Sequence, residues 1–155
     1  MKTTRLLTCL VLILSILPFA VIANVEDDRR QKAERYYQKG DYKKAYKTYL
    51  KSAKSGDHYS QYMLAQMFSK GQGTKTNLIE AYAWAELAAE GDLEEAPIIS
   101  DKLLQQVEDK AKAQKQAEKL KSKYGVQALA EKASRKSKRS SSGSCTGSRL
   151  ACYTS

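Results

Sequence analysis

Two segments of the chain match each other at a constant spacing, and this internal repeat restricts the fold more than any other feature of the sequence. Ala45 recurs 36 positions later as Ala81, and Ala53 recurs at the same interval as Ala89. A period of roughly 35 residues is the length of one helix-turn-helix unit in stacked helical repeats. The sequence therefore predicts an all-α fold, a short α-solenoid of about two helix-turn-helix repeats followed by a C-terminal capping helix.

The first unit carries the signals of a helix and of both its ends. Apolar residues between Tyr42 and Ala53 follow the three-four spacing of one buried helix face. Asp41 can cap the start of this helix, and Gly56 suits the left-handed position just after its end. We expect its partner helix at 27–39.

The second unit carries similar signals with a more apolar helix. Asn77 precedes Glu80 by three positions, a variant of the capping box, and Gly91 closes the helix that follows. The alanines of this helix leave a shallow surface that a neighbouring helix can approach closely. Because the helix is apolar on nearly every side, it must be covered from more than one direction. We expect its partner helix at 58–69.

These residues also resemble a known repeat family. The pattern is similar to the Sel-one-like repeat, a relative of the tetratricopeptide repeat, and its signature consists of Leu64, Gly71, Gly73, Ala81, Trp84, Ala88, Ala89 and Gly91. The resemblance is strongest over 58–96 and partial over 27–57. It implies antiparallel helix pairs in a short right-handed superhelix, and a role as an adaptor in bacterial envelopes or secretion-related assemblies. The chain departs from the family pattern at Ala65, Phe68, Thr74 and Asn77, and unit one has Thr48 in place of the tryptophan.

The segment after the repeat region 24–97 is expected to cap the stack. Apolar residues from Leu103 to Tyr124 continue a helical period, and Pro97 is tolerable only in a first helical turn. We therefore expect capping helices over 98–133, with a break at Gly125 and a short helix over 126–133. From Ser134 to the end, Ser, Lys, Arg and Gly dominate, which favours a flexible tail over 134–155.

The N-terminal segment has the pattern of an export signal. Lys2 and Arg5 precede an almost continuously apolar stretch over 6–22, and compact residues end at Ala23. We predict a signal peptide over 1–23, and a mature protein that is periplasmic or secreted and has no stable membrane span. An uncleaved anchor is the alternative, although Pro18 interrupts a run that is short for a spanning helix.

Two cysteines remain in the predicted mature chain. Cys145 and Cys152 lie in a Ser/Gly-rich end, and in an oxidising compartment such a pair would close a small disulfide loop. Metal binding is the alternative, but two cysteines without nearby histidines make a poor zinc site. We expect no metal and no cofactor.

The expected function is that of a non-enzymatic adaptor that binds a protein or peptide. Stacked helix pairs present a groove lined by their first helices. Tyr36, Tyr59, Tyr62 and Met63 fall on these helices, and aromatic residues and methionine are enriched in the cores of interfaces. These four residues are the candidate partner-binding set, and each is also a candidate for the hydrophobic core.

The basic tail offers an alternative function. From Lys132 onward the chain has six basic residues and no acidic one, with most of the charge between Lys132 and Arg139. This segment could attach the protein to anionic envelope polymers or lipid headgroups. Export argues against nucleic acid as a partner.

An enzyme is the least supported class. The chain has one histidine, His58, which is expected to lie at a helix entry. The carboxylates of Glu94-Glu95 and Glu108-Asp109 are expected on helix surfaces, and no nucleophile, histidine and acid form a recognisable motif. The sequence Gly71-Gln-Gly73 lacks the ending of a phosphate-binding loop.

Overall fold

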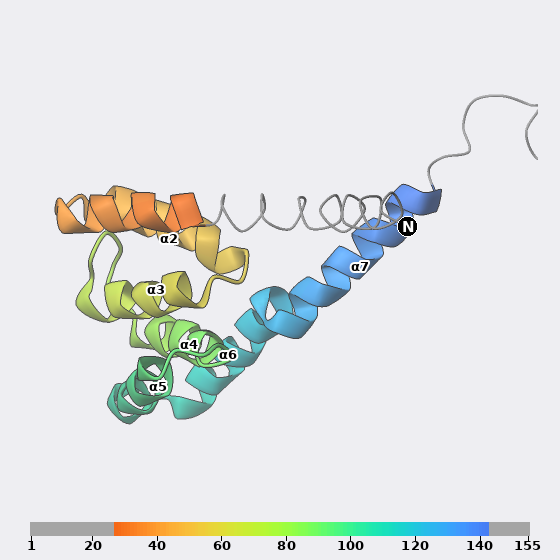
Figure 1. Cartoon of the computed structure of the whole chain (residues 1–155). Coiled ribbons are helices and arrows are strands. Elements are labelled where there is room, and N and C mark those ends of the chain that lie inside the picture. Colours follow the sequence, from red (N-terminus) through yellow and green to blue (C-terminus); the bar gives the residue numbers. More distant parts are fainter. Residues whose placement is uncertain (1–26, 143–155) are drawn as a thin grey trace, which may run out of the picture.

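The computed structural model describes residues 27–142, and this part of the chain is all-α with no strand (Figure 1). The first helical segment covers 27–38. Six helices follow it: α2 (Tyr42–Lys54), α3 (His58–Lys70), α4 (Leu78–Ala88), α5 (Glu95–Gln106), α6 (Lys110–Tyr124) and α7 (Val126–Ser142). The all-α class and the two predicted helix pairs are confirmed. The signal segment 1–23 and the pair Cys145 and Cys152 lie outside the described residues.

Four helices begin with a side chain that accepts a hydrogen bond from an amide of the first turn. This contact satisfies a backbone donor that has no partner inside the helix. The capping residues are Asp41 for α2, Asp57 for α3, Asn77 for α4 and Asp109 for α6. The cap predicted at Asp41 is therefore confirmed. The capping box at Asn77 is only half formed, because the carboxylate of Glu80 accepts its bond from Gln116 of α6 at 2.6 Å.

The two glycines that follow the repeat helices act differently. Gly56 has φ +98°, so it takes the left-handed conformation predicted after α2. Gly91 does not have a positive φ. A glycine is needed there because the partner helix α3 lies close to this position. A methyl group at Gly91 would overlap the ring of His58 and lie 2.9 Å from His58 Cβ. Gly91 therefore permits contact between the end of α4 and the start of α3.

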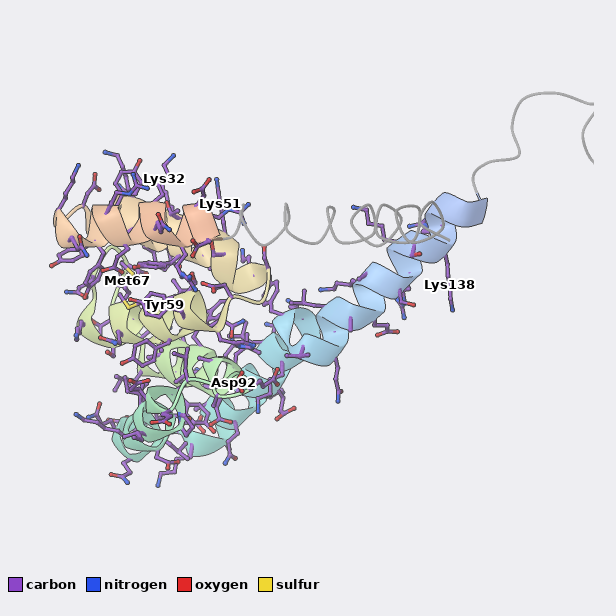
Figure 2. The ribbon with its side chains drawn as sticks, in the orientation of Figure 1. Lys32, Lys51, Tyr59, Met67, Asp92 and Lys138 are labelled. Carbon is purple, nitrogen blue, oxygen red and sulfur yellow. The ribbon has the colours of Figure 1, made fainter. Side chains whose placement is uncertain are left out.

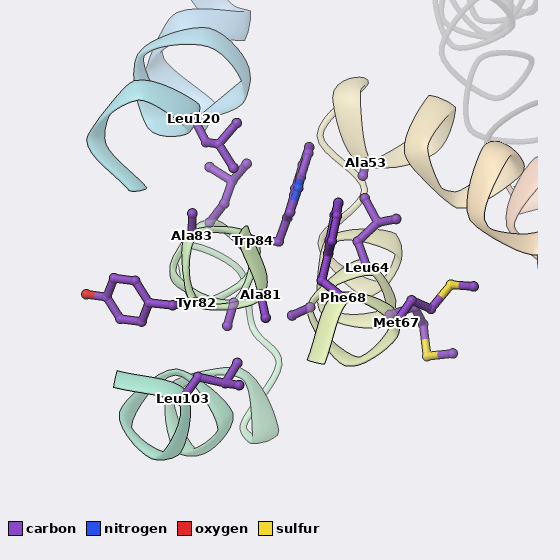
Figure 3. Packing of buried hydrophobic residues seen from close by; sticks show 14 of the residues in the cluster. Ala53, Leu64, Met67, Phe68, Ala81, Tyr82, Ala83, Trp84, Leu103 and Leu120 are labelled. Atoms are coloured by element: carbon purple, nitrogen blue, oxygen red, sulfur yellow. The ribbon is translucent and has the colours of Figure 1, made fainter. Parts of the chain in front are cut away.

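Helix α4 lies at the centre of the hydrophobic core. It packs against α3, α5 and α6, and Figure 3 shows Ala83 facing Leu120 of α6 while Leu103 of α5 lies below the helix. Its fully buried residues are Ala81, Ala83, Ala85, Leu87 and Ala88, and Trp84 is 3% exposed. The prediction that this apolar helix is covered from several directions is confirmed.

The predicted capping helix is two helices. The chain turns at Val107, which has extended backbone angles and is buried, and α6 begins after Asp109. The turn lets α5 and α6 cover different sides of α4. Glu108 and Asp109 consequently lie in this turn, and not on a helix surface as expected. Pro97 lies in the first turn of α5, as predicted.

Helix α7 extends to Ser142, which corrects the expectation of a flexible chain from Ser134. The run from Val126 has no glycine or proline before Gly143, and its Lys, Arg and Ala residues favour helix. Arg135 also pairs with Glu131 one turn earlier, at 2.6 Å. α7 packs on α6 and then projects away from the repeats (Figure 1).

Candidate binding groove

An open groove of about 380 Å³ lies along the first helical segment. Arg30, Glu34 and Arg35 line it from that segment, and Tyr59 closes it from the start of α3. Arg35 also borders a second hollow of about 510 Å³ that includes Tyr36. The two hollows lie on the first helical segment, and only Tyr59 in their lining comes from the first helix of the second unit.

The carboxylate of Glu34 lines the groove and links the first helical segment with α2 and α3. It accepts hydrogen bonds from the hydroxyl of Tyr49 on α2 at 2.5 Å and from the hydroxyl of Tyr59 on α3 at 3.2 Å. The ring of Tyr49 is fully buried, and its edge faces the ring of Tyr59 with centroids 6.5 Å apart. The polar floor of the groove is thus built before any partner arrives.

Burial and the same carboxylate keep both tyrosines protonated. The pKa of Tyr49 is raised far above its ordinary value, first by burial and then by the hydrogen bond to Glu34. The pKa of Tyr59 is raised by burial and by the charge of Glu34. Both hydroxyls therefore remain neutral hydrogen-bond donors to a higher pH than the hydroxyl of an exposed tyrosine.

Arg30 supplies positive charge at one side of the groove. Its guanidinium lies 5.9 Å from the centroid of the Tyr59 ring, within the range of a cation–π contact. Nη1 of Arg30 also lies 3.7 Å from a carboxylate oxygen of Asp57, and Nη2 pairs with Asp27. Arg35 is exposed and has no ion pair within the described residues, so it can receive a negative group from a partner.

The predicted partner-binding residues separate into two groups. Tyr59 lines the groove, and half-buried Tyr62 lies beside it with ring centroids 6.5 Å apart. Tyr36 borders the second hollow, below the ammonium group of Lys44 at 5.7 Å. Met63 is only 6% exposed and belongs to the core cluster, so its surface is occupied by other core residues.

The residues of the repeat signature have structural positions. Leu64, Ala81, Trp84 and Ala88 are buried in the core, whereas Gly71, Gly73, Ala89 and Gly91 lie at helix ends or turns. None of them lines the groove. The sequence did not single out Glu34 and Arg30, because charged residues recur throughout 27–38 and only the packing of α2 and α3 shows which of them face the tyrosines.

His58 is at a helix entry, as expected, and its Nδ1 lies 3.1 Å from Oε1 of Gln61. Among residues 27–142, no three side chains of His, Cys, Asp or Glu gather into a group that could hold a metal ion. Within the same range, no helix combines the length and apolar character needed to cross a membrane.

Comparison with known proteins shows the fold alone. No model of a protein family matches the chain, and no curated protein matches it in sequence. One solved structure is similar: c5321, described as a protective antigen present in uropathogenic Escherichia coli strains and displaying an SLR (Sel-one-like repeat) fold. The TM-score is 0.63 at 18% sequence identity, over 84% of this chain. The chain spans only 27% of that protein's length. The helical-repeat fold is thus shown, as the repeat spacing predicted.

Proposed function

We propose that this protein is an exported adaptor that binds a segment of another protein in the groove of its first helical segment and α3. The observation that carries the proposal is the preformed row of Arg30, Glu34 and Tyr59, with exposed Arg35 beside it. A groove that combines fixed aromatic surface with polar groups already in place loses little conformational entropy when it binds. Helical repeats of this kind commonly present such surfaces to peptides.

The chemistry of the lining favours a partner segment with an acidic side chain. Arg35 can pair with a carboxylate in two parallel hydrogen bonds, a geometry that lysine cannot reproduce. Tyr59 and Tyr62 offer adjoining aromatic surface for an apolar neighbour of that carboxylate. No catalytic step is required of the groove in this role.

The test is capture of a partner from an envelope extract with the chain 24–155 and two charge-reversal variants. Arg35→Glu changes the groove, while Lys102→Glu makes the same change on an exposed position of α5. We expect one discrete partner to be retained through a high-salt wash by the wild type and by Lys102→Glu. Arg35→Glu should retain at least about tenfold less, because arginines at interface centres carry much of the binding energy.

A shortened chain separates the groove from the basic helix. The chain 24–125 ends before α7 and should capture the same partner as 24–155. Equal capture by Arg35→Glu and the wild type would refute the groove as the binding site of the partner. Capture that requires α7 and is lost in salt would assign attachment to the segment 132–139, the alternative raised by the sequence.

Export is part of the proposal and is supported by Lys2, Arg5 and the apolar segment that ends before Ala23. The N-terminal residue of the protein recovered after expression of the full chain should be Asn24. If Cys145 and Cys152 are paired, the mass of the same protein without reduction should be two hydrogens lower than its mass after reduction. An intact N-terminus would instead favour a retained anchor.

A further inference from the structure

Helix α2 carries a stripe of lysines along its outer face. Its sequence contains five lysines, Lys43, Lys44, Lys47, Lys51 and Lys54, and no acidic residue. All five are exposed. With 3.6 residues per turn they fall within an arc of about 100°. The buried residues of α2, among them Ala45, Tyr49 and Ala53, occupy the opposite side.

Three of these lysines have neither an ion pair nor a contact with an aromatic ring within the described residues. Lys44 pairs with Asp41 at 2.7 Å, and Lys54 lies over the ring of Tyr124 at 6.0 Å. Within the described residues, Lys43, Lys47 and Lys51 form no ion pair. They follow one another at one-turn intervals, where like charges repel. Figure 2 shows Lys51 projecting from the outer side of the molecule, in the same direction as Lys32 of the first helical segment.

The repeat itself shows that this face is unusual. At a spacing of 36, Lys47 and Lys51 correspond to Ala83 and Leu87 of α4, and both of those residues are fully buried. The face that packs against other helices in the second unit is therefore a solvated cationic face in the first unit. Such a face opposes the docking of another apolar helix and favours a surface of negative charge.

We propose that the stripe of Lys43, Lys47 and Lys51 docks the protein on an anionic lipid surface. Lysine ammonium groups are compact charges on flexible stems, which suits mobile headgroups better than one fixed phosphate. Two rings beside the stripe, Tyr36 and Tyr124, already lie under the ammonium groups of Lys44 and Lys54, which makes them poor stacking platforms for the bases of a single-stranded nucleic acid. The apolar segment 6–22 also brings the chain to a membrane during the proposed export.

Docking through α2 leaves the groove accessible. The groove is lined by residues of 27–38 and by Tyr59 of α3, and no α2 lysine contributes to it. An adaptor held in this way could bind its partner while it rests on the membrane. The docking proposal does not depend on the proposed partner, because lipid binding is measured without one.

The experiment uses chain 24–155, which keeps every described residue, and vesicles of neutral phosphatidylcholine with or without a third of anionic phosphatidylglycerol. Lys47→Gln/Lys51→Gln removes two charges of the stripe with a residue that also favours helix. Lys75→Gln/Lys102→Gln removes two exposed charges elsewhere and is the matched control. Arg135→Gln/Lys136→Gln removes two charges of α7. Circular dichroism establishes that all four proteins are folded.

We expect the wild type to sediment with anionic vesicles and not with neutral ones. Added salt should release it from the anionic vesicles. Each lysine near an anionic surface strengthens partitioning about fivefold, so the α2 variant should bind roughly 30-fold more weakly. The Lys75/Lys102 control should change by less than about threefold. Loss in the α7 variant with full binding by the α2 variant would overturn the proposal in favour of the tail. Equal loss in the control, no vesicle binding, or binding to duplex DNA alone would overturn it as well.

Discussion

Two glycines with the same backbone conformation should respond very differently to the same substitution. Gly40 has φ +76° and Gly73 has φ +72°. A methyl group at Gly40 would have no atom within 4 Å. At Gly73 it would overlap the carbonyl oxygen of Tyr42 and lie 2.5 Å from the carbonyl carbon and 3.0 Å from the amide nitrogen of Lys43. Gly73 thus lets the loop of the second unit rest on the start of α2.

The magnitudes follow from these surroundings. Alanine in the left-handed conformation costs about 1–2 kcal/mol, partly offset by about 0.4–1 kcal/mol because it also stiffens the unfolded chain. Gly40→Ala should therefore lower the free energy of unfolding by about 1 kcal/mol. Gly73→Ala has the same backbone cost and must in addition displace main-chain atoms, which adds roughly 1–3 kcal/mol.

The assay is urea unfolding and thermal melting of both variants beside the wild type, followed by circular dichroism. For a domain of this size, the extra loss at Gly73 corresponds to a melting temperature lower by roughly 5–12 °C than that of Gly40→Ala. Equal melting temperatures for the two variants would refute the close approach of the loop to α2. If the stability of Gly73→Ala equals that of the wild type, the left-handed backbone conformation of Gly73 would be refuted as well.

Three further results are expected. Gly91→Ala should destabilise by about 1–3 kcal/mol because the new methyl group overlaps the His58 ring, and less in a His58→Ala background, which a double-mutant cycle of melting measures. Stability should fall as the pH rises above 10.0, the ordinary pKa of tyrosine, because the raised pKa of Tyr49 lets only the unfolded chain ionise there. Urea midpoints between pH 8 and 11 should show this fall, and Tyr49→Phe should reduce it. The chain 24–125 should keep a sharp thermal transition, whereas 24–94, which uncovers α4, should lose it and shift the emission of the single tryptophan, Trp84, to the red. Equally sharp melting of 24–94 would mean that α5 and α6 do not stabilise the stack.

The helices of the repeats could be predicted because the signals that define them are local. Asp41 and Asn77 bind amides three residues ahead, and the buried stripe of α2 follows from spacing alone. The division of the capping region 98–133 into two helices could not be predicted from local signals. Asp109 caps α6 by accepting from the amide of Lys112, but acidic residues on helix surfaces have the same appearance in sequence. The turn at Val107 lets both α5 and α6 pack on α4, a contact that the local sequence does not reveal.

The place of Glu34 in the groove could not be predicted for a related reason. Glu34 is one of several charged residues in 27–38, and its hydrogen bonds reach residues 15 and 25 positions away. Contacts of that range depend on how three helices are rotated against one another. Tyr59 was identified because it lies three residues before Tyr62 on one helix face. Met63 lies on the same helix but is buried in the core.

The two units differ most at the places where function is proposed. Ala45 and Ala81 match at the repeat interval and are both fully buried, so this pair specifies how helices pack within a unit. Tyr49 corresponds to Ala85, which has no hydroxyl group to bind a carboxylate at the equivalent position. Because the bond from Tyr49 to Glu34 has no equivalent in the second unit, this part of the groove arises from a departure from the repeat. The lysine stripe of α2 also departs from the repeat, since Lys47 and Lys51 correspond to Ala83 and Leu87 of α4, which are apolar and fully buried. The residues shared by the two units therefore lie in the packed stack, and the two proposed binding surfaces lie at residues that break the repeat.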